Sequence, residues 1–244
     1  MSSLPPEEAN FPWDDPAAIY PDRTDAVAFD APDGLSVLYA DDVLLVLDKP
    51  AGLLSVPGRG ADKQECLSRR AQRRWPDAMV VHRLDMATSG VMLLARGLAA
   101  QRGLNQAFAQ RRISKRYLAI VDGPLDAPPG DWGVMSLPIG IDWPQRPRRV
   151  IDLEHGKPSV TRWRVLSHNA SAGTSRLELE PVTGRSHQLR VHLQAMGHDI
   201  LGDALYGTAR TQAMADRLLL HASSIVLSHP ITAEPLRFTS TPEF

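Results

Sequence analysis

The residues best suited to chemistry lie in the run H-R-L-D-M-A-T-S-G at positions 82–90. Its one carboxylate, Asp85, follows the cation Arg83 and precedes a turn-forming Thr-Ser-Gly sequence. Apolar residues at 79–81 and 91–95 predict a buried strand on each side. A loop held by a rigid scaffold is a common place for catalytic groups. Asp85 is therefore a candidate nucleophile or base, and the competing interpretation is an aspartate that only caps a turn.

A second polar run, T-G-R-S-H-Q-L-R-V-H, occupies positions 183–192. Arg185 precedes the expected start of a helix, and Arg190 lies one turn inside it. His187 and His192 are five residues apart, whereas two metal ligands on one helical face are four apart. With no H-E-x-x-H sequence and a single cysteine, a metal site is not expected. For a histidine at a helix start, a structural role is the first interpretation.

The third run, Q-R-R-I-S-K-R-Y at 110–117, ends in Tyr117 at the expected start of a strand. Its four cations are Arg111, Arg112, Lys115 and Arg116. Beside a groove they would form a phosphate-binding stripe, and elsewhere a solvated face. Arginines at 69–74 and at 146–149, the latter near Trp143, leave the same two interpretations open.

Phosphate-binding and hydrolase signatures are missing. The sequence contains no G-x-x-x-x-G-K, no G-x-G-x-x-G and no G-x-S-x-G pattern. Nucleotide-driven chemistry and a nucleotide cofactor are therefore not expected.

Composition favours one globular body in the cytoplasm. The chain has 244 residues, 43% of them hydrophobic, which suffices for a sizeable core. No apolar run reaches the roughly 18 residues of a membrane span, and the N-terminus lacks signal-peptide order. Cys66 is the one cysteine, which favours a reducing compartment.

Charge is unevenly distributed along the chain. The net charge is -1, but residues 1–35 hold eight acidic residues and one arginine. Residues 36–244 therefore keep 26 basic and 20 acidic residues, an excess compatible with a polyanionic partner. We expect residues 1–35 to be an acidic, proline-rich leader, poorly ordered or packed on the body, and residues 36–244 to be the catalytic domain.

The pattern of elements predicts an α+β fold with a largely antiparallel mixed sheet flanked by helices and loops. Expected strands cover 36–39, 43–47, 79–81, 90–95, 117–121, 161–165, 177–179, 225–227 and 236–238. Expected helices cover 64–75, 98–111, 186–196 and 209–219, and residues 124–150 are expected to be rich in loops.

With these motifs in view, the chain resembles the RluA family of pseudouridine synthases. The matching runs are K-P-A-G-L-L-S-V-P-G at 49–58, the runs at 82–90, 115–117 and 183–192, G-H-D-I-L-G-D-A-L-Y-G at 197–207 and L-L-L-H-A at 218–222. They span the whole expected body. The form of the run at 82–90, together with D-W-P-Q-R-P at 142–147, is most similar to the dual-specificity member.

The resemblance implies roles for particular residues. Asp85 matches the catalytic carboxylate, Tyr117 the tyrosine against the target base, and Arg185 the arginine paired with the aspartate. Leu220 would line the pocket and Arg83 would lie beside the displaced base. The residues expected to bind substrate are Arg83, His82, Leu220, Arg111, Arg112, Lys115, Arg116 and Arg190.

The implied reaction is the isomerisation of uridine to pseudouridine in structured RNA. Implied partners are a tRNA anticodon stem–loop and a large-subunit rRNA hairpin, with no membrane, no metal, no cofactor and a monomeric enzyme. Open alternatives are another rRNA or tRNA uridine, a non-catalytic RNA-binding protein on the same fold, and a hydrolase using Asp85. The chain departs from the family at Asp199, where relatives have proline, and no S4-type RNA-binding domain is expected before the body.

Overall fold

The structure, a computed structural model, describes residues 20, 22–24, 29–30, 34–125 and 131–244. Its strands are β1 (Phe29–Asp30), β2 (Ser36–Ala40), β3 (Leu44–Lys49), β4 (Ala78–Val80), β5 (Ser89–Arg96), β6 (Ser114–Asp122), β7 (Gly133–Ser136), β8 (Ile139–Ile141), β9 (Arg149–Ile151), β10 (Val160–Asn169), β11 (Thr174–Pro181), β12 (Leu220–Ser228) and β13 (Pro235–Thr239). Its helices are the 3-10 turn η3 (Ala61–Lys63), α1 (Leu67–Arg74), α2 (Gly97–Ala109), α3 (Gln188–Ala195) and α4 (Ala209–Ala213).

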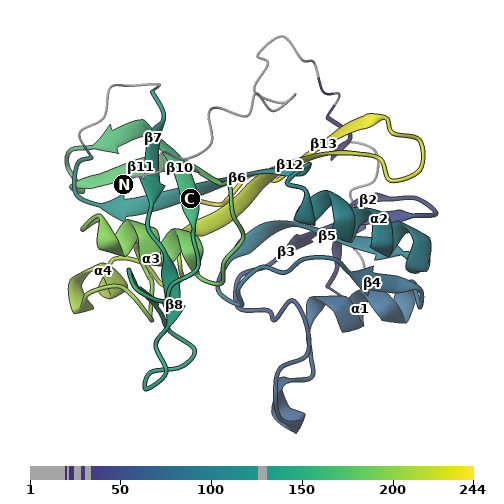
Figure 1. Cartoon of the computed structure of the whole chain (residues 1–244), viewed down its shortest axis with the longest axis horizontal. Coiled ribbons are helices and arrows are strands. Elements are labelled where there is room, and N and C mark those ends of the chain that lie inside the picture. Colours follow the sequence, from purple (N-terminus) through teal and green to yellow (C-terminus); the bar gives the residue numbers. More distant parts are fainter. Residues whose placement is uncertain (1–19, 21, 25–28, 31–33, 126–130) are drawn as a thin grey trace.

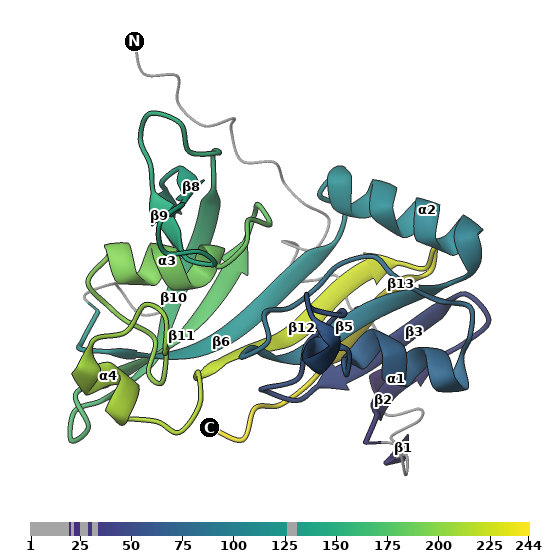
Figure 2. The same ribbon diagram turned by 90° about the horizontal axis from the view of Figure 1, so that it is seen from below.

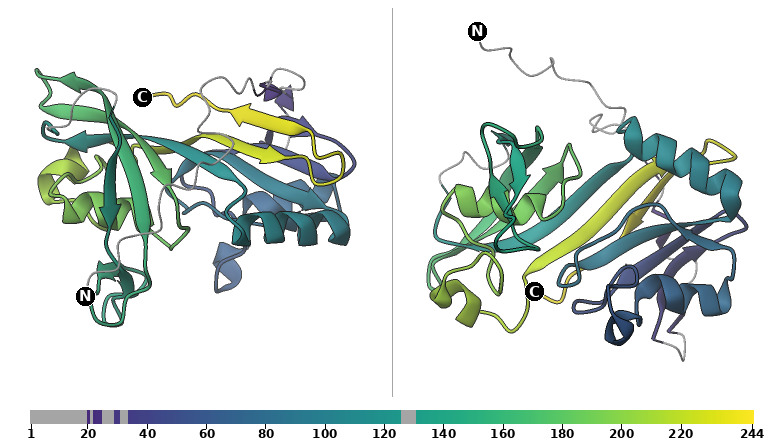
Figure 3. Two further views of the ribbon diagram at one scale, coloured as in Figure 1. Left: turned by 45° about the horizontal axis from the view of Figure 1, so that its top comes forward. Right: turned by 60° about the horizontal axis from the view of Figure 1, so that its bottom comes forward.

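One mixed sheet runs through the molecule in the order β1-β2-β3-β5-β12-β6-β11-β10-β7, with β4 paired to β5 and β13 to β12. Every pairing in it is antiparallel except that between β5 and β12. Strands β6 and β12 cross the middle, between a half that carries α1 and α2 and a half that carries α3 and α4 (Figures 1, 2 and 3). The predicted α+β class with a largely antiparallel sheet is confirmed.

The apolar runs of β3 and β5 are continuous because both faces of these strands are buried. Leu45 and Met92 face α1, while Leu44 and Leu93 face α2 and β13. In the other half, α3 packs its own leucines against β6 and β11. The two packed halves thus meet at β12 and β6, where Tyr117 packs against the core of each half.

The parallel seam between β5 and β12 requires a glycine. Gly90 has φ +109, and a Cβ there would lie 2.3 Å from the carbonyl oxygen of Ala222. The two strands therefore approach closely where the 82–90 run enters the sheet, at the register pair Gly90 and Ala222.

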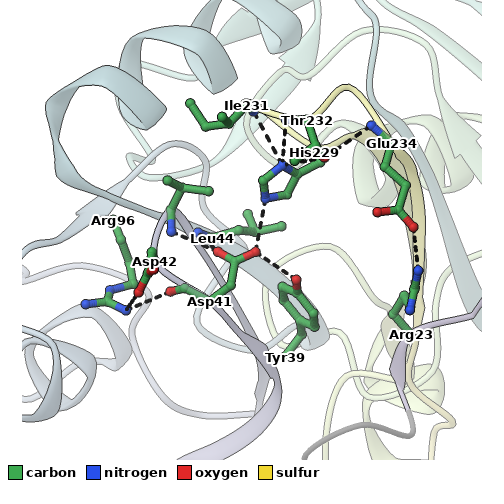
Figure 4. Close-up of polar contacts among 11 residues, drawn as sticks. Arg23, Tyr39, Asp41, Asp42, Leu44, Arg96, His229, Ile231, Thr232 and Glu234 are labelled. Atoms are coloured by element: carbon green, nitrogen blue, oxygen red, sulfur yellow. Dashed lines mark hydrogen bonds and ion pairs between the residues drawn. The ribbon is translucent and has the colours of Figure 1, made fainter.

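Two hairpins are tied together far from this seam, around Asp41 (Figure 4). Asp41 accepts hydrogen bonds from the backbone of Val43 and Leu44, which closes the expected β2–β3 turn. Its second oxygen accepts from Tyr39 Oη at 2.7 Å and from His229 Nε2 at 3.0 Å. The β2–β3 hairpin and the β12–β13 hairpin are thereby fixed to each other.

Part of the expected leader lies against the body. Arg23 donates from its backbone to Arg237 O at 3.0 Å and forms an ion pair with Glu234. Strand β1 pairs with β2. Most of residues 1–35 fall outside the described residues.

One sequence-based prediction of secondary structure was wrong. The helix expected over 209–219 ends at Ala213, and Leu218 and Leu220 are buried with strand period. The region 124–150, expected to be rich in loops, is mostly loop in its described residues, which also contain β7, β8 and the start of β9. None of the described helices is long and apolar enough to cross a membrane.

Candidate active site

Asp85 lies in the loop between β4 and β5, on the wall of a cavity of about 590 Å³. Its side chain is 26% exposed, so it is held by protein and open to the cavity. The lining comes from both halves of the molecule and includes Arg83, Lys115, Tyr117, Arg185, His187, Arg190 and Leu220. The loop predicted at 82–90 therefore places its carboxylate at a concave site.

The backbone on both sides of Asp85 is bound by the 49–58 loop. Ser55 Oγ donates to Leu84 O at 2.6 Å and accepts from Leu84 N at 3.1 Å. On the other side, Met86 O accepts from Lys49 Nζ at 3.0 Å and from Gly52 N at 2.9 Å. These four bonds fix the backbone of the loop on each side of Asp85 and so limit where its carboxylate can lie.

Lys49 is a fully buried cation beneath this loop. Its ammonium group also donates to Pro50 O at 2.9 Å and to Leu53 O at 2.8 Å. Burial lowers the pKa of Lys49 to about 8, against the opposing effect of Asp85 and Asp48. Three carbonyl acceptors match the three donors of an ammonium group, so its hydrogen bonding is complete.

The cation that contacts Asp85 is Arg190. Its Nη1 lies 3.3 Å from Asp85 Oδ2, while Nε and Nη2 bind both oxygens of Asp203 at 2.8 and 2.6 Å. Arg190 and Asp203 are almost wholly buried, with side chains 5% and 1% exposed. A bidentate pair of this kind fixes the guanidinium plane and directs its remaining edge at Asp85.

The expected pairing of Arg185 with Asp85 was wrong. Arg185 lies before the helix, on the cavity wall, and its Nε donates to Pro158 O at 3.3 Å. Helix α3 begins at Gln188 after a left-handed residue, His187, with φ 57. This turn leaves Arg185 in the loop and rotates Arg190 inward. Arg190, expected to bind substrate, takes the place next to the carboxylate.

His187 is a second neighbour of Asp85, at 3.8 Å between Nε2 and Oδ2. Its Nδ1 lies 2.7 Å from Tyr206 Oη, which accepts from the backbone N–H of Arg149 at 2.7 Å. Tyr206 is 3% exposed, and its oxygen already accepts from Arg149. We therefore assign its hydroxyl hydrogen to His187 Nδ1, which puts the proton of the neutral His187 ring on Nε2, facing Asp85. Burial lowers the pKa of His187, which keeps the ring neutral at neutral pH.

Tyr117 lies in β6 on the same cavity, packed between the core clusters of the two halves. Burial raises the pKa of its phenol, and the charge of Asp85 adds to the effect. The hydroxyl therefore stays protonated across the neutral range. A flat ring beside a carboxylate provides a surface on which a base can stack.

Four of the other residues predicted to bind substrate line the cavity. Arg83 is exposed, Arg111 lies in a left-handed turn with φ 56, and Leu220 is buried, all three on the lining. Lys115 also lines the cavity, with Nζ 6.0 Å from the centre of the Phe108 ring. Burial lowers the pKa of Lys115, opposed by Glu180. These cations can reach a backbone phosphate or base in the cavity.

Two cations of the 110–117 run lie elsewhere. Arg116 pairs with Glu180 and its guanidinium lies 4.7 Å from the centre of the Trp132 ring. Because side chains alternate along a strand, Arg116 points away from the face that carries Tyr117 and is not on the cavity lining. Its contact with substrate stays a prediction. Arg112 is exposed and bonded to Gln110. On α1, Arg70 and Arg73 pair with Glu65, as on a solvated face.

His82, which was predicted to bind substrate, lines the cavity and also supports its wall. Its Nε2 accepts from the backbone N–H of Leu93 at 2.8 Å, and its ring lies 4.9 Å from that of Phe108. Burial, with a smaller contribution from Lys115, lowers the pKa of His82 to about 3. The neutral ring thus fastens the Asp85 loop to β5.

We expect acid to destabilise the protein through His82. Its pKa is about 6.5 when unfolded and about 3 when folded, so the unfolded state binds more protons between these values. Unfolding free energy should fall as pH drops below 6.5, by about 2 kcal/mol at pH 5 from this group. Urea denaturation of wild type and His82→Gln measures it. Equal pH slopes in the two proteins would contradict the assignment.

Sequence reasoning missed four residues of the site: Lys49, His187, Asp203 and Tyr206. Each stands in one of the motif runs, but only the folded chain shows which carboxylate or carbonyl it meets. Among the described residues, no group of three or more His, Cys, Asp or Glu is placed to hold a metal ion. The chemistry that this site offers is that of a fixed carboxylate acting as nucleophile or base beside a protonated phenol.

Comparison with known proteins agrees with this geometry. The family model described as RNA pseudouridylate synthase matches residues 43–195. Curated proteins named dual-specificity RNA pseudouridine synthase RluA are 46% identical, over 86% of this chain and 94% of the protein from Escherichia coli O6:H1, and over 85% and 99% for Yersinia pestis. The solved structure of human RNA pseudouridylate synthase domain containing 1 has a TM-score of 0.73 at 30% identity, covering 88% of this chain and 86% of its own.

Proposed function

The chain belongs to the RluA family of RNA pseudouridine synthases and isomerises uridine to pseudouridine in RNA, and we propose that it does so in a tRNA anticodon loop and in a hairpin of large-subunit rRNA. The supporting observation is that relatives named dual-specificity are about 45% identical over almost their whole length. Another rRNA or tRNA uridine is the alternative.

The reaction needs a nucleophile or a base beside the ribose of the target uridine. The N1–C1′ bond breaks, the base turns, C5 bonds to C1′, and the hydrogen on C5 leaves as a proton while N1 gains one. Asp85 can attack C1′ or remove a proton from the sugar, and both roles require its charged form. We assign Arg190 to stabilise that charge and His187 Nε2–H to orient the carboxylate.

The base must leave its stack before Asp85 can reach C1′. We propose that the base stacks on Tyr117 and contacts Leu220, with Arg83 beside the position that it leaves. Lys115, Arg111 and Arg185 are placed on the lining to hold the backbone. Substrate and product contain the same atoms in the same oxidation state, so we propose that the reaction uses no cofactor. We also propose that the protein is a monomer and acts in the cytoplasm.

Modification of two synthetic RNAs tests the target. The purified protein is incubated separately with a tRNA anticodon stem–loop and a large-subunit rRNA hairpin, and pseudouridine is mapped at nucleotide resolution. We expect one modified uridine in each loop, and none when the loop sequence is scrambled. Modification of only one RNA would reject dual specificity, and modification of neither would direct the search to another uridine.

A further inference from the structure

The β8–β9 hairpin stands apart from the main sheet. Its strands pair only with each other in the sheet order of the described residues, with Ile139 opposite Ile151 and Ile141 opposite Arg149. Figure 1 shows it extending below α3, away from the sheet. The loop at its tip is D-W-P-Q-R-P-R at 142–148.

The base of the hairpin is firmly attached. Ile139 is buried and packs with Val191 of α3 and Tyr206. His192 Nε2 lies 3.0 Å from Leu137 O, which anchors the strand entering the hairpin. The hairpin is therefore a rigid projection with a fixed position relative to α3.

The most exposed aromatic side chain of the hairpin is at its tip, where Trp143 is 62% exposed. Ile141 and Val150 are also exposed, but they point to opposite faces of the ribbon, because Ile141 lies opposite Arg149 and Val150 opposite Gly140. The Arg146 guanidinium lies 4.6 Å from the centre of the Trp143 ring. An exposed tryptophan ring with a guanidinium against one face leaves its other face open to a flat partner.

The positive charge and the exposed aromatic ring of the hairpin tip favour an anionic partner with flat apolar faces. Residues 142–149 hold three arginines, Arg146, Arg148 and Arg149, against one acidic residue, Asp142. Aromatic rings with adjacent cations are the means by which proteins bind unpaired nucleotides, stacking the base and holding the phosphate. Single-stranded RNA meets both requirements at once.

The hairpin is also connected to the reacting group. Arg149 N–H bonds Tyr206 Oη, Tyr206 bonds His187 Nδ1, and His187 lies 3.8 Å from Asp85. The guanidinium groups of Arg148 and Arg190 lie 5.5 and 5.0 Å from the centre of the Tyr206 ring. A nucleotide held on the tip is thus held at a fixed distance from the cavity.

We propose that the β8–β9 hairpin is an RNA-docking arm, in which Trp143, backed by Arg146, stacks an unpaired base of the substrate loop outside the catalytic cavity. This deepens the proposed function and depends on an RNA stem–loop as substrate. The arm selects loops that present an unpaired base at the spacing set by the Arg149–Tyr206–His187 connection.

Binding of the synthetic tRNA anticodon stem–loop to Trp143→Ala tests the arm. Loss of one base stack should raise Kd and KM about tenfold, with a much smaller change in kcat. Trp143→Phe should recover most of the affinity. Ile231→Ala, at a side chain 64% exposed on the distant β12–β13 turn, is the matched control and should bind as wild type.

Unchanged Kd in Trp143→Ala would overturn the arm. So would a dimer that dissociates in this variant, since the surface would then bind a second copy of the chain. Failure of the proposed target has a different signature: the wild type would form no pseudouridine in this RNA, whereas the affinity difference between the variants would remain.

Discussion

Asp85→Asn should abolish pseudouridine formation and leave RNA affinity nearly unchanged. Asparagine keeps the size of the side chain and an oxygen for Arg190, but it carries no charge and cannot attack C1′ or accept a proton from the sugar. We expect turnover to fall by more than about 10⁴-fold, the scale on which removing an essential catalytic group acts. Single-turnover assays and a binding isotherm on the same stem–loop measure the two quantities.

The control for Asp85→Asn is a measurement of its thermal stability, which shows whether the variant is folded. The side chain is 26% exposed and its loop is held through the backbone by Lys49, Gly52 and Ser55, so the thermal midpoint should change little. A stable variant that retained turnover within about tenfold would remove Asp85 from the reaction.

The second large effect is expected at Arg190, in contrast to Arg185. Arg190→Gln leaves the buried carboxylate of Asp203 without its bidentate partner and Asp85 without its cation. Breaking such a pair costs about 3–5 kcal/mol of stability. Loss of a charge-stabilising donor should lower kcat by about 10²–10³-fold. Thermal denaturation and single-turnover rates measure these losses.

Arg185→Gln should raise KM and change kcat little, because Arg185 lies on the cavity wall and bonds Pro158. Arg190→Lys separates charge from geometry: it keeps the cation but not the two-pronged contact to Asp203. We expect Arg190→Lys to recover stability in part and kcat less. A larger kcat loss in Arg185→Gln than in Arg190→Gln would reverse the assignment.

Local pattern was sufficient for the elements that place Asp85. Short apolar runs on each side of the Asp41-Asp42 turn predict the β2–β3 hairpin, and the apolar runs on each side of 82–90 predict β4 and β5. These signals are local, because hydrophobic period and turn chemistry act over a few residues. The prediction of a helix over 209–219 was wrong, because burial of Leu218 and Leu220 in the core beside β6 and α3 outweighed helix propensity.

Local sequence pattern could not predict which side chains of the site contact each other. Arg185 and Arg190 occupy one ten-residue motif, and the choice between them depends on the left-handed conformation of His187 and the helix start at Gln188. Lys49 meets Met86 and Arg190 meets Asp203 only after distant segments pack. The sequence predicts a basic patch around Trp143, but the exposure of Trp143 and the connection of its hairpin to the cavity depend on tertiary structure.

Release of the C5 hydrogen tests the central claim most directly, because joining C5 to C1′ expels it from every uridine converted. Stem–loop RNA labelled with tritium at C5 of uridine is incubated with wild-type protein or with Asp85→Asn, and tritium in water is counted. We expect the wild type to release one equivalent per target uridine and Asp85→Asn to release none. Equal release by the two proteins, or no release by the wild type from tRNA and rRNA alike, would contradict an Asp85-dependent pseudouridine synthase.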